Sequence, residues 1–469
     1  MKETIKKINQ GFILIKHGQY DVSTEEGRNN ERLRRMMLAS IMAMIYKLIS
    51  VLTPIITIRV SFNYLGQEVY GLWNTVTSFF TMFVFADLGL GNGLQTQLSQ
   101  ASGLEDSKNI SRKIISSAYL MLFIVSMCFL VIFIGIFPFV DWSKLMNANN
   151  KRIISLTSKI VLAIVIPRIL NIPFSLVQRT QLALQDGFNS YVWQSIGSLV
   201  SLLSIYIVAW LDLGSIFLIW VSSLATVIVS IINMIVYFNF KKKELAPKFM
   251  YVDTKITKQL LQTGVGFLIL SILTTLGLAL DNFIVATKIS LDEAAVYSIL
   301  YKMIHMISMM TTMITALLWG ANGEAMARGD FKWVKNIAKK VSKISLIVSI
   351  VASVFIYFSI DFIIKVILGQ QLEFSMYLVI GMCLLEILLS FISPYFMILN
   401  AAGIVKFQIC LFALHTPISF FLKLYFAERF GAIAIPFVGT MSYLIFIVPW
   451  VYYSSIKVLD RKEINKGER

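Results

Sequence analysis

The chain has 469 residues, of which 57% are hydrophobic and only 14% are charged. This is too little polar surface to cover a soluble globule, so the composition indicates a membrane protein. The net charge of +16 would also fit a nucleic-acid-binding protein, and its distribution along the chain decides between the two. The three cysteines all lie inside apolar runs, an odd set that predicts neither a disulfide framework nor a metal site.

Twelve apolar runs are long enough to cross a bilayer core, which takes about 20 residues. The first thirty-odd residues precede them and lack the apolar centre of a signal peptide, so the first span is expected to act as the insertion signal. In chain order the runs are 36–60, 69–91, 114–140, 153–178, 191–209, 214–240, 260–286, 294–320, 341–363, 374–399, 404–427 and 432–451. We therefore predict an all-α, polytopic membrane protein with about twelve transmembrane helices.

The Lys and Arg residues outside these runs are distributed very unevenly. If both termini are cytoplasmic, thirty of them fall in cytoplasmic segments and six in outside segments. This is the positive-inside pattern of membrane proteins. It places both termini in the cytoplasm and accounts for the positive charge through topology and contact with lipid headgroups, without nucleic acid as a partner.

One sequence unit occurs twice. Residues 65–113 contain an aromatic start, a long apolar run, the dipeptide Asn92–Gly93 and a basic end. The same order recurs around Asn322–Gly323, 230 residues later. Each half of the chain contains six spans, so both halves have the same orientation in the membrane. The repeat is therefore parallel and forms two six-helix lobes. The predicted parts are an N-terminal extension (1–35), the N-lobe (36–240), a cytoplasmic linker (241–258), the C-lobe (259–456) and a cytoplasmic tail (457–469).

Six cations lie inside the predicted spans, where a charge near hydrocarbon costs at least about 2.5–3.5 kcal/mol. They are Lys47, Arg59, Lys159, Arg168, Lys302 and Lys423. At 1.5 Å per residue, Lys47, Arg168 and Lys302 lie roughly 15–20 Å deep, whereas the other three can extend toward the outer interface. Lys302 and His305 share a helix face. We expect them to form a buried cationic patch, with no acid next to it in the sequence, that favours an anionic substrate.

Three acids lie inside the spans, namely Asp87, Asp281 and Glu386. One interpretation pairs each of them with a buried cation that holds helices together. The other assigns them to ion coupling, through H⁺ or Na⁺, because none has a counterpart across the repeat. Asp87 is followed by Gly89, Gly91 and Gly93, where a helix could bend as a gate. These glycines lack the strand and lysine of a nucleotide site, and no metal ligand set or other cofactor site is predicted.

The motifs LGQEVYGLW and FADLGLGNGL, a basic loop after the second span and twelve spans in two lobes resemble a known family. They are similar to the bacterial O-antigen and capsular repeat-unit flippases of the multidrug/oligosaccharidyl-lipid/polysaccharide exporter superfamily. The resemblance covers residues 36–456 and is strongest over 52–113. It implies a transporter, not an enzyme, in the bacterial inner membrane, with a V-shaped chamber lined mainly by spans 1, 2, 7 and 8.

The resemblance also implies a substrate and a set of site residues. An undecaprenyl-pyrophosphate-linked oligosaccharide would move from the inner to the outer leaflet by alternating access, with polysaccharide polymerase or assembly proteins as further partners. The chamber residues are then Lys47, Arg59, Arg168, Lys302, His305 and Lys423, and the coupling residues are Asp87, Asp281 and Glu386.

Three alternatives stay open. A multidrug antiporter of the same superfamily would need an acidic chamber for cationic substrates, whereas these spans are net basic. A peptidoglycan-precursor flippase is closer in chemistry, but the count of twelve spans weighs against it. A membrane-embedded glycan polymerase or ligase would need a large outside loop with catalytic carboxylates or arginines, and the longest outside loop, around 140–152, is short.

Overall fold

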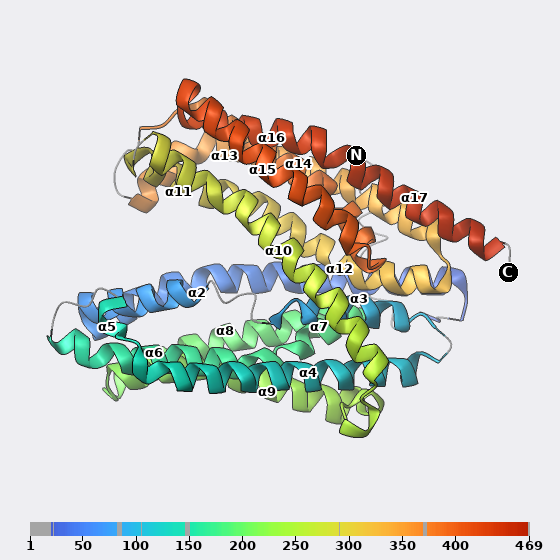
Figure 1. Cartoon of the computed structure of the whole chain (residues 1–469), viewed down its shortest axis with the longest axis horizontal. Helices are drawn as coiled ribbons and strands as arrows, with labels where there is room; N and C mark the ends of the chain where they lie inside the picture. Colours follow the sequence, from blue (N-terminus) through green and yellow to red (C-terminus); the bar gives the residue numbers. More distant parts are fainter. Residues whose placement is uncertain are drawn as a thin grey trace. The chain divides into compact units, whose positions relative to one another are not determined.

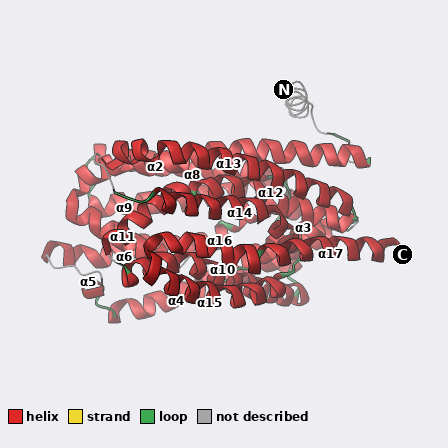
Figure 2. Ribbon diagram, turned by 90° about the horizontal axis from the view of Figure 1, so that it is seen from above, coloured by secondary structure: helices red, strands yellow, loops and turns green. Residues whose placement is uncertain are grey.

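A computed structural model of the chain describes residues 20–21, 23–81, 87–104, 106–145, 151–289, 291–368 and 373–467. These residues form helices and short turns, and none of them belongs to a strand (Figure 2). Within the same ranges, nine helical segments are long and apolar enough to cross a membrane. The predicted all-α, polytopic membrane fold is therefore confirmed.

The chain divides into two compact units, Met1–Val265 and Gly266–Arg469, and the division falls inside α10. The described elements of the first unit are α2 (Glu25–Thr81), α3 (Leu90–Ala101), α4 (Ser107–Ile136), η2 (Phe137–Phe139), α5 (Trp142–Leu145), α6 (Lys151–Phe174), α7 (Leu176–Ala183), α8 (Gly187–Trp210), α9 (Ser215–Val236), η3 (Tyr237–Lys241), η4 (Lys243–Leu245), η5 (Phe249–Tyr251) and the start of α10 (Thr254–Lys288). Helix α8 packs between α2 and α9, and α6 packs on α9 and α4 (Figure 1).

The second unit contains the rest of α10, followed by α11 (Leu291–Ile304), α12 (Met306–Arg328), α13 (Phe331–Leu368), α14 (Met376–Ala401), α15 (Val405–Phe430), η6 (Gly431–Ile433), α16 (Ala434–Phe446) and α17 (Val448–Gly467). Helix α14 is central in this unit, because it packs against α11, α12, α13, α16 and α17. Its apolar side chains join those of its neighbours in one large core cluster. The titratable side chains of α14 are therefore held at the centre of the unit.

The predicted run 69–91 is not one helix, and this part of the prediction is wrong. Helix α2 contains the first two predicted spans up to Thr81, with a kink at Gly66, where φ is 76° and ψ is 163°. Leu88 and Gly89 then take positive φ values of 51° and 70°. Such left-handed backbone ends a right-handed helix, so α3 starts anew at Leu90. The sequence predicted flexibility at these glycines but not the turn.

The segment predicted as a linker, 241–258, is packed onto α4 of the first unit. Ser116 and Ser117 accept hydrogen bonds from the backbone N–H groups of Lys248 and Asp253, both at 3.1 Å. Lys113 lies 3.6 Å from the Asp253 carboxylate. These contacts tie the segment down over much of its length. The predicted limits of the lobes themselves stay a prediction.

The end of the N-terminal extension forms the first turns of α2. Glu31 lies there with its side chain only 4% exposed, and it bonds Arg34 at 2.8 Å and Arg35 at 2.7 Å. Burial raises the pKa of Glu31, but hydrogen bonds from both arginines and from the Tyr20 backbone more than offset this and lower the pKa to about 2. The carboxylate therefore stays charged at neutral pH and fixes both arginines at the start of α2.

The orientation of the chain in the membrane is a testable prediction. In a variant without the native cysteines, we expect Lys144→Cys to react with an impermeant maleimide added to intact cells. We expect Lys243→Cys to react only after permeabilisation, because it belongs to the basic segments that the positive-inside pattern places in the cytoplasm. Both side chains are exposed in the structure, so burial does not limit either reaction. The reverse labelling pattern would contradict the predicted topology.

Candidate functional site

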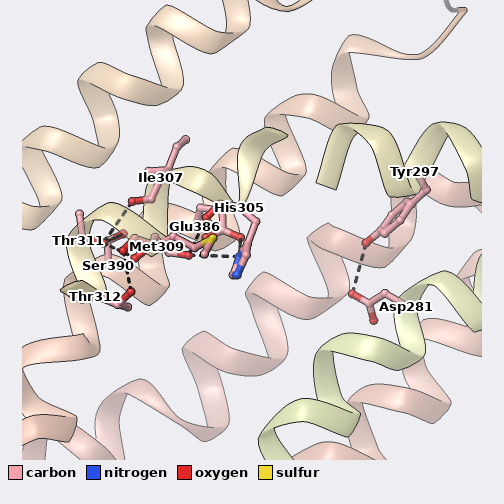
Figure 3. A network of polar contacts seen from close by, with 10 residues as sticks. Asp281, Tyr297, His305, Ile307, Met309, Thr311, Thr312, Glu386 and Ser390 are labelled. Atoms are coloured by element: carbon pink, nitrogen blue, oxygen red, sulfur yellow. Dashed lines mark hydrogen bonds and ion pairs between the residues drawn. The ribbon is translucent and has the colours of Figure 1, made fainter. Parts of the chain in front are cut away.

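The second unit contains an ion pair in its interior, between α10 and α15. Lys423 Nζ donates a hydrogen bond to Asp281 Oδ1 at 2.5 Å, and each side chain is 5% exposed. The Tyr297 hydroxyl donates to the other carboxylate oxygen of Asp281 at 3.3 Å (Figure 3). Both oxygens of the acid are thus occupied. A buried charge pair is tolerated when its remaining hydrogen-bonding groups are satisfied in this way.

A second polar pair lies where α11 ends and α12 begins. His305 Nδ1 is 2.9 Å from Glu386 Oε1 of α14, and the Tyr301 ring stacks on the imidazole with centroids 5.0 Å apart. Figure 3 shows the two side chains pointing toward each other. Glu386 is buried, and its second oxygen, Oε2, has no hydrogen-bond partner among the described residues. One carboxylate oxygen is therefore available to a proton, a water or a cation.

Hydroxyl pairs continue this contact along α12 and α14. Thr311 lies 2.8 Å from Ser390 and Thr315 lies 2.7 Å from Ser393, oxygen to oxygen. Thr311 and Ser390 also appear in the network of Figure 3. The interface of these two helices is thus polar over about three turns, which is unusual for apolar spans and keeps His305 and Glu386 in fixed register.

The predicted cationic patch needs correction. The side chain of Lys302 is exposed in the structure, whereas we expected it to be buried beside His305. His305 is half-buried and contacts an acid instead of adding to a cluster of cations. The acid comes from α14, 81 residues away, and such a partner cannot be recognised from spacing. What remains is an exposed cation one turn from a histidine that contacts an acid.

The other predicted chamber cations are dispersed. Lys47 is half-buried on α2, and Arg168 is exposed on α6. Their depth in the membrane stays a prediction. Lys423 is buried in its ion pair and does not extend toward the outer interface. The side chain of Arg59 lies outside the described part of the chain.

Asp87 lies in the turn before α3. Its Oδ1 accepts a hydrogen bond from the Gly89 backbone at 3.0 Å. A methyl group placed on Gly91 would lie 2.9 Å from Asp87 Oδ2 and 3.3 Å from Arg179 Cγ of α7. The side chains of Asp87 and Arg179 therefore both lie close to Gly91. Nothing in the spacing of Arg179 along the sequence pointed to Asp87.

The glycines predicted as a gate allow close packing. A methyl group on Gly93 would lie 3.2 Å from the Leu260 carbonyl oxygen and 3.3 Å from the Gly264 nitrogen, both in α10. Backbone atoms cannot move aside as flexible side chains do. Helix α3 and the start of α10 therefore approach this closely only because Gly93 and Gly264 have no side chains. A gating role for Gly89, Gly91 and Gly93 stays a prediction.

A small cavity of about 80 Å³ adjoins the buried ion pair in the second unit. His415 and Lys423 of α15 line it together with Thr416 and Ser419. His415 Nε2 lies 3.2 Å from Ser442 Oγ, while its Nδ1 has no hydrogen-bond partner in the described part of the chain. Within the described residues, no group of three or more His, Cys, Asp or Glu side chains is arranged to hold a metal.

A basic pocket of about 320 Å³ lies in the first unit, at the start of α2 and the end of α9. Its cations are Arg34, Arg35, Lys241 and Lys242, and its acids are Glu31 and Asp186. The acids do not balance the cations, so the pocket is net positive. All of its charged residues belong to segments that the Lys and Arg pattern places at the cytoplasmic side.

This fold, with charged and polar groups inside its long apolar helices, is that of a multi-pass membrane protein. The fold is shared with solved transporters. An outward-facing multidrug resistance MATE family transporter of the MOP superfamily matches this fold with a TM-score of 0.75 at 13% identity. The match covers 91% of this chain and 96% of that chain. A MOP superfamily transporter from Pyrococcus furiosus gives a TM-score of 0.72 at 14% identity, with 91% and 96% of the two chains covered.

The sequence identifies the family. Residues 38–318 match the sequence pattern of a family described as "polysaccharide biosynthesis protein". The chain is a member of that family. A Yersinia pseudotuberculosis protein whose name assigns it to O-antigen export is 22% identical over an alignment of 432 residues that covers 88% of this chain and 94% of that protein. The resemblance to the O-antigen and capsular flippases is confirmed.

Proposed function

We propose that the protein is a flippase for a lipid-linked oligosaccharide. Its substrate is an undecaprenyl-pyrophosphate-linked repeat unit of a surface polysaccharide, which it moves across the bacterial inner membrane by alternating access. The observation that carries the proposal is the family match over residues 38–318. The name of the Yersinia pseudotuberculosis relative, which refers to O-antigen export, supports the same substrate class.

The charge of the substrate fits the exposed cation near the His305–Glu386 pair. His305 Nδ1 is already in contact with Glu386, at 2.9 Å, so Lys302 is the exposed cation of this cluster that can meet a pyrophosphate or an acidic sugar. Hydrogen bonds between an ammonium and phosphate oxygens are short and roughly twice as strong as neutral ones. We assign the anionic part of the substrate to Lys302 on this basis, with His305 as its neighbour.

The test of this function is a deletion strain complemented with variants. Deletion is expected to remove the long surface polysaccharide and leave single lipid-linked repeat units in the inner leaflet. Loss of a polymerase would instead leave single units at the surface, and loss of a ligase would leave lipid-linked chains on the outer face of the membrane. A peptidoglycan-precursor flippase would be needed for growth. Wild-type surface polysaccharide in the deletion strain would exclude the proposed function.

In that strain, Lys302→Ala is expected to reduce surface polysaccharide at least about tenfold, because one charge-assisted contact is worth about 1.5–3 kcal/mol. Lys302→Arg keeps the charge and should retain most of the export. Lys365→Ala, which removes another exposed lysine of the second unit, serves as the matched control and should have no effect. Export is measured by surface immunoblot at equal membrane abundance. Normal export by Lys302→Ala would refute the role of Lys302.

A further inference from the structure

A polar cavity of about 190 Å³ lies inside the first unit, among α2, α6, α7, α8 and α9. It is far larger than the roughly 10–15 Å³ that one ordered water requires, and smaller than the 300–1,000 Å³ of sites for drug-sized ligands. Its described lining residues include no Lys, Arg, Asp or Glu. Uncharged amides and hydroxyls dominate it, among helices otherwise rich in apolar residues.

The hydroxyls of this cavity are left with free acceptor capacity. Ser198 donates its hydroxyl to the Gln194 carbonyl at 3.2 Å, and Thr226 donates its hydroxyl to the Ser223 carbonyl at 3.0 Å. Each donor proton is thus used inside its own helix, and the oxygen lone pairs can accept from a ligand. Gln194 similarly donates its amide to Ser190 and keeps its amide oxygen as an acceptor.

One lining residue has a polar atom that is not satisfied. Asn171 Oδ1 on α6 is buried and has no hydrogen-bond partner among the described residues. A buried polar atom without a partner costs about 1–3 kcal/mol, so such an atom beside a cavity indicates a missing donor. By contrast, Gln181 and Asn233 bond each other's amides at 2.8 and 3.4 Å. Of these two, Asn233 lines the cavity, and the pair holds it in place.

Two aromatic side chains, Tyr46 of α2 and Trp193 of α8, complete the lining. The Tyr46 ring stacks on the Tyr191 ring, with ring centroids 6.0 Å apart. The negative face of an aromatic ring attracts weakly positive C–H groups, such as those on one face of a pyranose ring. The lining thus combines hydrogen-bond acceptors for hydroxyl groups with aromatic surface for the C–H face.

We propose that this cavity binds one neutral sugar ring of the transported repeat unit. An ion would find no opposite charge here, and a lipid chain would leave the amides unsatisfied. A neutral polyol both donates to the acceptors and offers a C–H face to the rings. The inference rests on the proposed function, and it adds a contact for the uncharged part of the substrate. Residues 193–198 lie about 9–16 Å from the start of α8, in the half predicted to be cytoplasmic.

The cavity can be filled without disturbing the helices around it. Ser198→Leu and Thr226→Leu each place apolar volume in it and remove an acceptor. Ser204→Leu is the matched control, because Ser204 is a half-buried serine of α8 outside the cavity lining whose hydroxyl also bonds a carbonyl of its own helix, that of Ser201 at 2.7 Å. The probes are galactose, glucose and N-acetylglucosamine, added to the purified full-length protein in nanodiscs and followed by saturation-transfer NMR. Inorganic pyrophosphate and choline serve as an anionic and a cationic comparison.

At least one neutral sugar is expected to bind the wild type and Ser204→Leu equally, and to bind Ser198→Leu and Thr226→Leu about tenfold more weakly, a change of about 1.4 kcal/mol. Pyrophosphate and choline should not compete. The inference is wrong if no neutral sugar binds, or if binding survives both substitutions. Because binding is measured without transport, this result is independent of the deletion strain. If deletion removes the polysaccharide but both variants bind and export normally, the flippase function stands and the sugar site does not.

Discussion

Lys423→Ala is expected to destabilise the protein by about 3–5 kcal/mol, one of the largest effects of any single substitution that the structure suggests. The substitution leaves the Asp281 carboxylate buried with the Tyr297 hydroxyl, at 3.3 Å, as its donor among the described residues. The charged form then lacks the partner that offsets its loss of hydration. Chemical or thermal unfolding of the purified protein in detergent, followed by intrinsic fluorescence, measures the change.

Two comparisons separate the pair from a general loss of packing. In the double variant Asp281→Leu/Lys423→Met no buried charge remains, so most of the lost stability should return. Lys288→Ala removes one partner of an exposed pair, with Glu428 at 2.6 Å and exposures of 39% and 54%. It should cost no more than about 1 kcal/mol. Equal effects of Lys423→Ala and Lys288→Ala would contradict the importance of burial.

The helices of this protein could be predicted from its sequence because the membrane imposes a simple rule on them. Each predicted run meets the length that hydrocarbon requires, and each overlaps a helical segment of the structure. The errors lie where local backbone chemistry overrides that rule. The run 69–91 ends early because Leu88 and Gly89 are left-handed, and the run 294–320 is divided at His305 between α11 and α12.

The two copies of the sequence repeat do not share the same local structure. Asn92 and Asn322 are matched in sequence, each followed by glycine. Asn92 lies in the first turn of α3, a helix that begins after a break, whereas Asn322 lies deep inside the continuous helix α12. Asn322 is fully buried. Equivalent positions have thus acquired different local structures, and a shared dipeptide does not determine whether a helix begins there or continues.

The partners of the buried acids could not be predicted, because each comes from a distant helix. Lys423 lies 142 residues from Asp281, and spacing within one helix says nothing about such a contact. The sequence allows two interpretations of these acids, pairing with a cation or ion coupling. Asp281 has the partner that the first interpretation requires. Glu386 contacts a histidine through one oxygen only, and Asp87 crowds Gly91 beside Arg179, so for these two acids the second interpretation stays open.

This difference in partners ranks the acids as candidates for ion coupling. Glu386 has one carboxylate oxygen without a described partner, and its neighbour His305 is 31% exposed, which offers a proton or a cation a route to the pair. Asp281 has both oxygens bonded and is 5% exposed. We therefore expect Glu386→Gln to reduce the response of transport to an imposed ion gradient most, and Asp281→Asn to act mainly through stability.

The measurement is transport of the lipid-linked oligosaccharide in proteoliposomes under a proton gradient, a sodium gradient or a membrane potential. Each elementary charge that crosses with the substrate draws about 2.3 kcal/mol per 100 mV, so loss of a coupled charge changes the voltage response by a measurable amount. Wild type is compared with Asp87→Asn, Asp281→Asn and Glu386→Gln at equal amounts of folded protein. Glu373→Gln, an exposed acid before α14, is the matched control. If Glu386→Gln and Asp87→Asn both keep the full response to every gradient, these carboxylates do not couple transport, and their contacts with His305 and with Gly89 serve the fold alone.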